Sequence, residues 1–418
     1  ISSFQLCRVE ADAARAALMA SQVAALAKHP SPRSRIIRRN ARVASVAAVA
    51  QHEAAHRLAA LQLWALVSIR ALPIGRPSPW NEEATRRAPA FARFDSGWYN
   101  SIVEKGYPPP PAAGAQSEHA FFPLYPMAAR VIHLATGLDS FRAAVVVSWT
   151  ALLLAVPLLA AEARERFGEG ADRGALPFLL LYPVAFFLAA VYTESLFLLL
   201  ALLAFRASRR NELAPALLFG LLLGLTRAPA VAVGPGLAVA WGLAGAAGAR
   251  RAAGAALLLV APLAGVLAWV FGIGLLQGEP MLFFRSMSAW RASAGDPLAG
   301  AVAFVLEPVR MLRTGWFREH PGAVAPFVHF ALFGLLGAFQ LRMRRWADAA
   351  WTAGVLGLAV ATGTADGVPR YTLTVYPGHF AAAALCEARP RLKALWLGAS
   401  LALLLLNSAF FVNWHFVS

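Results

Sequence analysis

The sequence predicts an all-α integral membrane protein, a multi-pass bundle of about 11 transmembrane helices. Of the 418 residues, 59% are hydrophobic and only 14% are charged, whereas soluble domains average about 45–50% and about 25%. The basic residues behind the net charge of +16 stand in short clusters between apolar runs, as in cytoplasmic loops. This pattern excludes a disordered chain and a transmembrane β-barrel, whose strands alternate apolar and polar residues. It also argues against nucleic acid as a partner.

Apolar runs that reach or approach the roughly 20 residues needed to cross a bilayer define the predicted spans. The first is weak because Gln62 and Arg70 interrupt it, and the fourth and fifth are short. The predicted spans are 57–74, 141–161, 175–192, 194–207, 212–226, 229–248, 253–276, 323–341, 347–363, 371–387 and 393–412.

The basic clusters orient these spans through the positive-inside rule. Residues 1–56 form a basic N-terminal cytoplasmic segment, for which disorder is one interpretation, and 57–418 form the transmembrane domain. All later clusters fall inside if residues 121–138 lie on the outer surface without crossing. Two large outer loops result, about 75–140 and 277–322. The clusters are Arg164 and Arg166; Arg206, Arg209 and Arg210; Arg250 and Arg251; Arg342, Arg344 and Arg345; and Arg389, Arg391 and Lys393.

Aromatic and proline residues in both outer loops are typical of short amphipathic helices that lie along a membrane surface. Long loops in compact proteins are usually functional, so these loops are where we expect the site. The aromatic residues are Trp80, Trp98, Tyr99, Tyr107, Trp290 and Trp316.

Asp95 is the candidate catalytic residue, in the first outer loop within Phe94-Asp95-Ser96-Gly97. A carboxylate among aromatic residues at the membrane surface can accept a proton from a hydroxyl group. The alternative is a structural role as the N-cap of a helix, which aspartate also fills well.

Four further polar residues lie at the outer ends of predicted spans, where they could bind a substrate or an anion. Glu194 is either a functional group at the membrane surface or an exposed residue in the first turn of a helix. Arg227 opposes the positive-inside trend and therefore needs an anionic partner, either Glu194 or a phosphate. Arg370 and Tyr371 repeat this pattern, with snorkelling to lipid headgroups as the alternative for Arg370.

His119, in the first outer loop, is a candidate phosphate ligand or simply an interfacial residue. A separate motif, His52-Glu53-Ala54-Ala55-His56, matches the zinc signature in which two histidines share one helix face. Asp366 would be the third ligand of an intramembrane protease. The predicted topology opposes this hypothesis, because it places His52 inside and Asp366 outside.

Several motifs resemble those of the GPI mannosyltransferase 2 (PIG-V) family and its bacterial homologues, within the GT-C superfamily of membrane glycosyltransferases. They run in the family's order over most of residues 93–380, and the fourth is the most specific. The matching stretches are FDSGWY, KGYP, AFFPLYP, LYPVAFFLAAVYTESLFLLLALLAF, GLLLGLTRAP and RYTLTVYP.

The resemblance implies transfer of a sugar, with mannose favoured, from a polyprenyl-phosphate donor on the extracytoplasmic face of the cell membrane. It also implies an acidic catalytic base in the first outer loop, for which Asp95 is the residue present. Arg227 and Arg370 would bind the donor phosphate at headgroup level. The acceptor could be a glycan, a glycolipid or a protein. No cofactor is expected, although one carboxylate with water could hold a divalent ion weakly. A lipid-linked sugar flippase is the non-enzymatic alternative.

Overall fold

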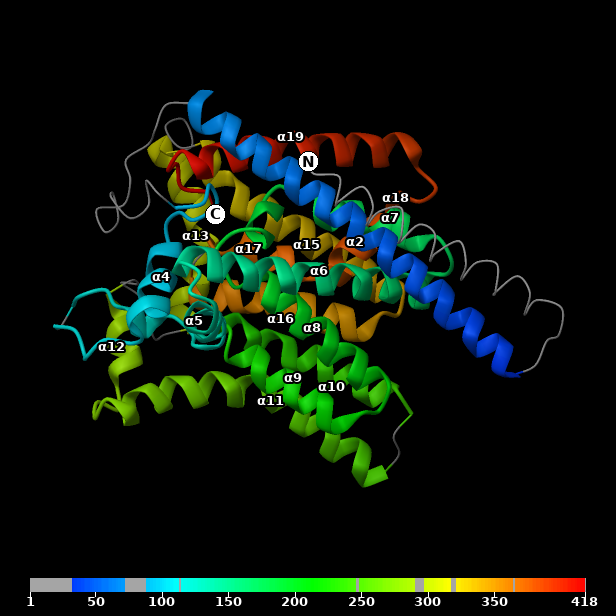
Figure 1. Ribbon diagram of the computed structural model, residues 1–418, viewed down its shortest axis with the longest axis horizontal. Helices are drawn as coiled ribbons and strands as arrows, with labels where there is room; N and C mark the ends of the chain where they lie inside the picture. The colour runs from blue at the N-terminus through cyan, green and yellow to red at the C-terminus, as the bar shows by residue number, and fades with distance from the viewer. Residues whose placement is uncertain are drawn as a thin grey trace.

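The computed structural model describes residues 32–71, 88–112, 114–245, 248–289, 297–316, 321–363 and 365–417. Every element in these ranges is an α-helix or a 3-10 helix, in agreement with the predicted all-α class. Figure 1 shows most of the helices running along the long axis of the molecule, with α6 near the middle of the view.

Helix α2 (Pro32–Ala71) is one continuous helix and therefore crosses the boundary at residue 56 that the sequence predicts. It packs against α6 (Ser140–Phe167) and α19 (Pro390–Val412), and it runs obliquely across the front of the bundle in Figure 1. The indole Nε1 of Trp64 donates to the carbonyl oxygen of Leu405 at 2.9 Å. Residues 1–31 of the predicted cytoplasmic segment lie outside the described part.

Within the described residues, four helices are long and apolar enough to cross a membrane by length and composition. They are α6, α11 (Gly248–Leu276), the segment Gly322–Arg342 that contains α15 (Ala325–Arg342), and α19. Each coincides with a predicted span. The total of about 11 crossings stays a prediction.

The predicted span 175–192 is wrong as a single helix. The chain forms α7 (Ala171–Leu180), a turn, and the 3-10 helix η3 (Ala185–Leu188). Pro183 has no backbone N–H for the carbonyl group of Leu179, and the residue before a proline disfavours the helical conformation. The result is a buried segment, 182–193, that is not α-helical and leads directly into Glu194 at the start of α8.

The predicted span 371–387 is also broken, into α17 (Val368–Thr374) and α18 (Tyr376–Cys386). Pro377 has no N–H for the carbonyl group of Leu373. The Nε2 atom of buried His379 lies 3.3 Å and 3.2 Å from the carbonyl oxygens of Thr372 and Leu373, where it can donate to either. The break makes α17, which carries Arg370, a separate helix from α18.

The remaining apolar segments form α8 (Glu194–Arg209), α9 (Leu213–Gly224), η4 (Ala228–Val233), α10 (Gly234–Leu243) and α16 (Trp346–Thr362). Helices α9 and α11 meet through glycines. A Cβ atom on Gly265 would lie 2.1 Å from the Leu221 carbonyl oxygen, and one on Gly224 would lie 2.2 Å from the Pro262 carbonyl oxygen. Only glycine permits this approach of two backbones.

The first predicted outer loop contains α4 (Ser96–Lys105), η2 (Glu118–Ala120) and α5 (Leu124–Thr136). The second contains α12 (Leu282–Ser288), α13 (Pro297–Thr314) and η5 (Pro321–Val324). Helix α5 has 13 residues, about 20 Å at 1.5 Å per residue. It is therefore shorter than the roughly 30 Å hydrocarbon layer, as expected if residues 121–138 do not cross. Trp80 and Trp290 lie outside the described residues.

Three of the predicted cytoplasmic basic clusters meet at one end of the bundle. Buried Glu162 lies 3.6 Å from Arg166 Nη1 and 3.5 Å from Arg206 Nη1, and it also pairs with Arg209. Arg345 donates to the carbonyl oxygen of Arg166 at 2.8 Å. The clusters therefore share one side, as the positive-inside assignment requires, while the compartment they face stays a prediction.

Candidate active site

Asp95 occupies the N-cap position of α4, but its side chain makes no capping hydrogen bond. The structural interpretation of Asp95 as a side-chain cap is therefore wrong. Its Oδ2 atom instead accepts from Arg370 Nη1 at 3.3 Å, and 33% of the side chain is exposed. The next residue, Ser96, ties the start of α4 to the segment 182–193 by donating to the Val191 carbonyl oxygen at 3.2 Å.

Glu194 is fully buried at the start of α8, so its interpretation as an exposed turn residue is wrong. Its Oε1 atom accepts from Arg227 Nη1 at 2.8 Å and from Arg370 Nε at 2.8 Å, and Arg370 Nη2 is also 2.8 Å away. Glu194 is thus the anionic partner of both arginines. A buried carboxylate without such partners would be very costly.

The Arg370 guanidinium joins the two carboxylates and is enclosed by aromatic rings. Its Cζ atom lies 4.8 Å from the ring centroid of Phe187 and 4.6 Å from that of Tyr192. These rings restrict the guanidinium group and reduce its contact with water, which strengthens its ion pairs. Sequence reasoning missed both aromatic residues, although each stands within seven residues of Glu194 in the chain.

The four charged groups balance one another in number, with two arginines facing two carboxylates. An anionic ligand at this site would therefore compete with Asp95 or Glu194 for the guanidinium groups. Glu194 is buried and holds both arginines, whereas Asp95 has one longer contact and partial exposure. Asp95 is the carboxylate that an incoming ligand can displace or use.

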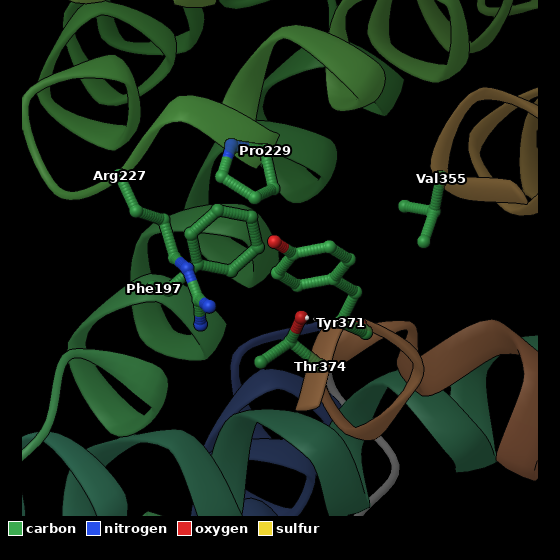
Figure 2. A pocket seen from close by; sticks show the side chains of 6 residues that line it. All are labelled: Phe197, Arg227, Pro229, Val355, Tyr371 and Thr374. Carbon is green, nitrogen blue, oxygen red and sulfur yellow. Dashed lines mark hydrogen bonds between the residues drawn. The ribbon is translucent and has the colours of Figure 1, made fainter. Parts of the chain in front are cut away.

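A pocket lies beside Arg227, and it is too narrow to hold a water molecule. Four segments supply its walls, as Figure 2 shows: Phe197 of α8, Arg227 and Pro229 at the start of η4, Val355 of α16, and Tyr371 and Thr374 of α17. The Arg227 Cζ atom lies 5.3 Å from the Tyr371 ring centroid. The pocket therefore combines an apolar wall with one cation.

His119 makes its contacts away from the four charged groups. Its Nε2 atom lies 3.0 Å from the Pro108 carbonyl oxygen, and its Nδ1 atom lies 3.2 Å from Ser117 Oγ. Burial lowers the pKa of its imidazole, so His119 is neutral at pH 7. A neutral histidine is a weaker phosphate ligand than a charged one, so the structure gives its predicted role no added support.

No group of three His, Cys, Asp or Glu side chains stands ready to hold a metal ion among the described residues. The two histidines of the zinc signature, His52 and His56, are exposed, and their Nε2 atoms are 2.9 Å apart. Asp366 is exposed in the turn before α17. Asp366 is therefore not grouped with His52 and His56 as a third zinc ligand, and the structure does not support the protease hypothesis.

No protein-family model matches the chain, and no curated protein matches it. Among solved structures, the chain is similar to the Archaeoglobus fulgidus oligosaccharyltransferase, crystallised in complex with zinc and sulfate. The sequences are 14% identical, with a TM-score of 0.40 over 86% of this chain. The match spans 53% of that protein, about half its length. A similarity this low establishes neither fold nor activity, so the proposals below depend on this chain's own residues.

Proposed function

We propose that this chain is a GT-C-type membrane glycosyltransferase that moves a sugar from a polyprenyl-phosphate donor to an acceptor hydroxyl group with inversion. Mannose is the proposed sugar, because the motifs of the first outer loop and of α8 resemble those of the PIG-V family. The proposed site lies on the extracytoplasmic face of a cell membrane. The acceptor is a glycan, a glycolipid or a protein, and no nucleic acid takes part.

The observation that carries this proposal is the contact between Asp95 and Arg370. Asp95 is the partly exposed carboxylate of the group, so it is accessible to a hydroxyl group. Arg370 reaches it from a partly buried position fixed by Glu194. A base and a phosphate-binding cation held side by side suit a reaction in which a proton arrives as a phosphate departs.

In the proposed step, Asp95 accepts the proton of the acceptor hydroxyl group. The oxygen of that hydroxyl group then attacks the anomeric carbon of the donor sugar. The bond from that carbon to the phosphate oxygen breaks on the opposite face, which inverts the configuration. One negative charge thereby passes from Asp95 to the departing lipid phosphate. Arg370 contacts Asp95 before the step, and with Arg227 it would stabilise the phosphate afterwards. One preorganised donor to such a charge is typically worth 10²–10³-fold in rate.

Arg227 and the pocket beside it supply the proposed contact for the lipid end of the donor. Phe197, Pro229 and Val355 give an apolar wall next to one guanidinium group, and an isoprenoid chain attached to a phosphate would have to part the walls of this narrow pocket to contact them. Tyr371 stacks near that guanidinium and limits its movement. We expect no resident cofactor; Asp95 with water could hold a divalent ion weakly.

Membranes containing the chain, supplied with polyprenyl-phosphate [³H]mannose, test the proposal. We expect transfer of label to a product that has lost the polyprenyl phosphate, and transfer at least about 100-fold slower in the Asp95→Asn variant. A nucleotide-activated mannose without the lipid should give none. Movement of the intact labelled lipid to the other leaflet, with no transfer, would instead identify a flippase.

A further inference from the structure

Two residues with strained backbones meet directly beside Asp95. Among the described non-glycine residues, positive φ occurs at Phe94, Asn211, Arg344 and Trp414. Phe94 (φ 53°) precedes Asp95, Trp414 (φ 66°) follows α19, and their ring centroids are 5.5 Å apart. Such conformations persist only where the surroundings enforce them, and they cluster at functional sites.

Residues 411–416, which we call the α19 end, surround Phe94. Its ring centroid lies 5.5 Å from Phe411 and 5.7 Å from Phe416, in addition to its contact with Trp414. Asn413 fastens the α19 end to α2 by donating to the Ser68 carbonyl oxygen at 3.1 Å.

Arg93 links the same two segments from the other side of Phe94. It is buried, and its donors reach the carbonyl oxygens of Val412 at 3.1 Å, Pro89 at 3.1 Å and Ala92 at 3.0 Å. Its Cζ atom lies 5.1 Å from the Trp414 ring centroid. Burial lowers its pKa to about 10, so it stays charged at neutral pH, where the carbonyl end of α19 favours a cation.

The backbone of Arg93 also contacts one of the two rings over Arg370, those of Phe187 and Tyr192, which we call the aromatic cage. Tyr192 donates its hydroxyl proton to the Arg93 carbonyl oxygen at 3.1 Å, and its ring covers the Arg370 guanidinium at 4.6 Å. Phe411 packs against both cage rings, 5.3 Å from Phe187 and 6.0 Å from Tyr192. The α19 end therefore contacts the segment before Asp95 and the cage around its ion-pair partner.

We propose that the α19 end positions Asp95 against Arg370, with Arg93, Phe94 and Trp414 as positioning residues. Asp95 lies on a short loop before α4, and the ion pair with Arg370 is long at 3.3 Å. A contact this long does not by itself hold Asp95 in place. The packing of Phe94 and Arg93 on the α19 end restrains the backbone next to Asp95. This inference depends on the proposed function for the chemistry of Asp95, but the placement itself can be measured without substrate.

The test compares Trp414→Ala with Trp414→Phe, Arg93→Lys and the control Leu406→Ala, whose side chain is exposed on the same helix. Amide hydrogen exchange of residues 94–99 is measured on the purified full chain in detergent. We expect exchange at least about threefold faster in Trp414→Ala and in Arg93→Lys, which loses the guanidinium fork. Trp414→Phe and Leu406→Ala should match the wild type, as should residues 160–166 in every variant.

Transfer from polyprenyl-phosphate mannose is measured in parallel. Trp414→Ala should lower kcat by about 10–100-fold, the typical cost of a misplaced group, with KM for the donor within about twofold. Trp414→Phe should restore kcat. Unchanged exchange at 94–99 in Trp414→Ala, or an equal loss of kcat in Leu406→Ala, would overturn the inference. If the wild type transfers no sugar, the proposed function fails and the exchange result alone decides the positioning role.

Discussion

Asp95 stands where a helix cap would stand but hydrogen-bonds with Arg370 instead. Asp95→Asn keeps the size of the side chain and loses its ability to accept a proton. We expect transfer to fall by about 10²–10⁴-fold, the usual contribution of a general base, at normal protein level.

The matched control is Asp139→Asn at the start of α6, where the aspartate does cap and accepts from the Arg142 backbone N–H at 3.0 Å. Asparagine caps about as well, so this variant should keep full activity. If Asp95→Asn kept about half of the wild-type activity, Asp95 would not be the general base.

Glu194 has a different role from Asp95, since its side chain is fully buried and one of its oxygen atoms pairs with two arginines. Glu194→Gln removes the charge and leaves both guanidinium groups uncompensated. Breaking a buried ion pair typically costs 3–5 kcal/mol, so the thermal midpoint in detergent should drop clearly.

Glu307→Gln serves as the control, because Glu307 pairs with exposed Arg310 on α13 and such pairs contribute little. Equal midpoints for the two variants would contradict the anchoring role of Glu194. Arg227→Ala and Arg370→Ala should each lower the thermal midpoint as well as donor use, since each removes one of the two partners of buried Glu194.

His119 predicts a pH dependence of stability. Burial lowers the pKa of its imidazole from 6.5, partly offset by its hydrogen bond to Pro108 and by Glu118 and Glu279, while Arg285 lowers it further. Just below pH 6.5, His119 therefore binds a proton in the unfolded chain but not in the folded protein. Its contribution to stability is complete above pH 6.5 and is lost as the pH falls through the lowered pKa. The thermal midpoint of His119→Gln should fall less than that of the wild type between pH 7.5 and 5. Parallel curves would contradict this.

At the scale of elements, the contact between α9 and α11 depends on glycine rather than on apolar area. Gly265→Ala would place a methyl group 2.1 Å from the Leu221 carbonyl oxygen, so the helices must separate. We expect a lower thermal midpoint and reduced yield. Gly272 lies on the same helix with nothing within 4 Å of a Cβ atom, and Gly272→Ala should be neutral or stabilising by about 1 kcal/mol. The same response from both would rule out the close contact.

At the scale of the whole molecule, the positive-inside rule predicts that the basic clusters face the cytoplasm and that the proposed site faces the opposite side of the membrane. In a background without cysteine, Ala115→Cys and Arg313→Cys should react with an impermeant maleimide added to intact cells. Arg210→Cys should react only after permeabilisation. All three positions are exposed, so access alone cannot explain a difference. Labelling of Arg210→Cys from outside would invert the assignment.

The sequence by itself determined the helical class, the four long apolar helices and the identity of the charged candidates. Apolar run length and the positions of basic clusters carry this information locally, because each helix satisfies its own backbone hydrogen bonds. The sequence also offered Glu194 as the partner of Arg227, and the structure confirms that contact. It missed the breaks at Pro183 and Pro377, where a proline within an apolar run counts little in hydropathy but removes a hydrogen bond.

Only the tertiary structure decided what each candidate touches. Arg370 is 275 residues from Asp95 and 176 from Glu194 in the chain, and no local pattern encodes such contacts. It also brought Phe187 and Tyr192 over Arg370 and placed the end of α19 against Phe94. Cation–π and ion-pair geometry depends on the relative packing of whole helices. Packing of that kind is fixed by shape complementarity across the bundle rather than by the composition of any one segment.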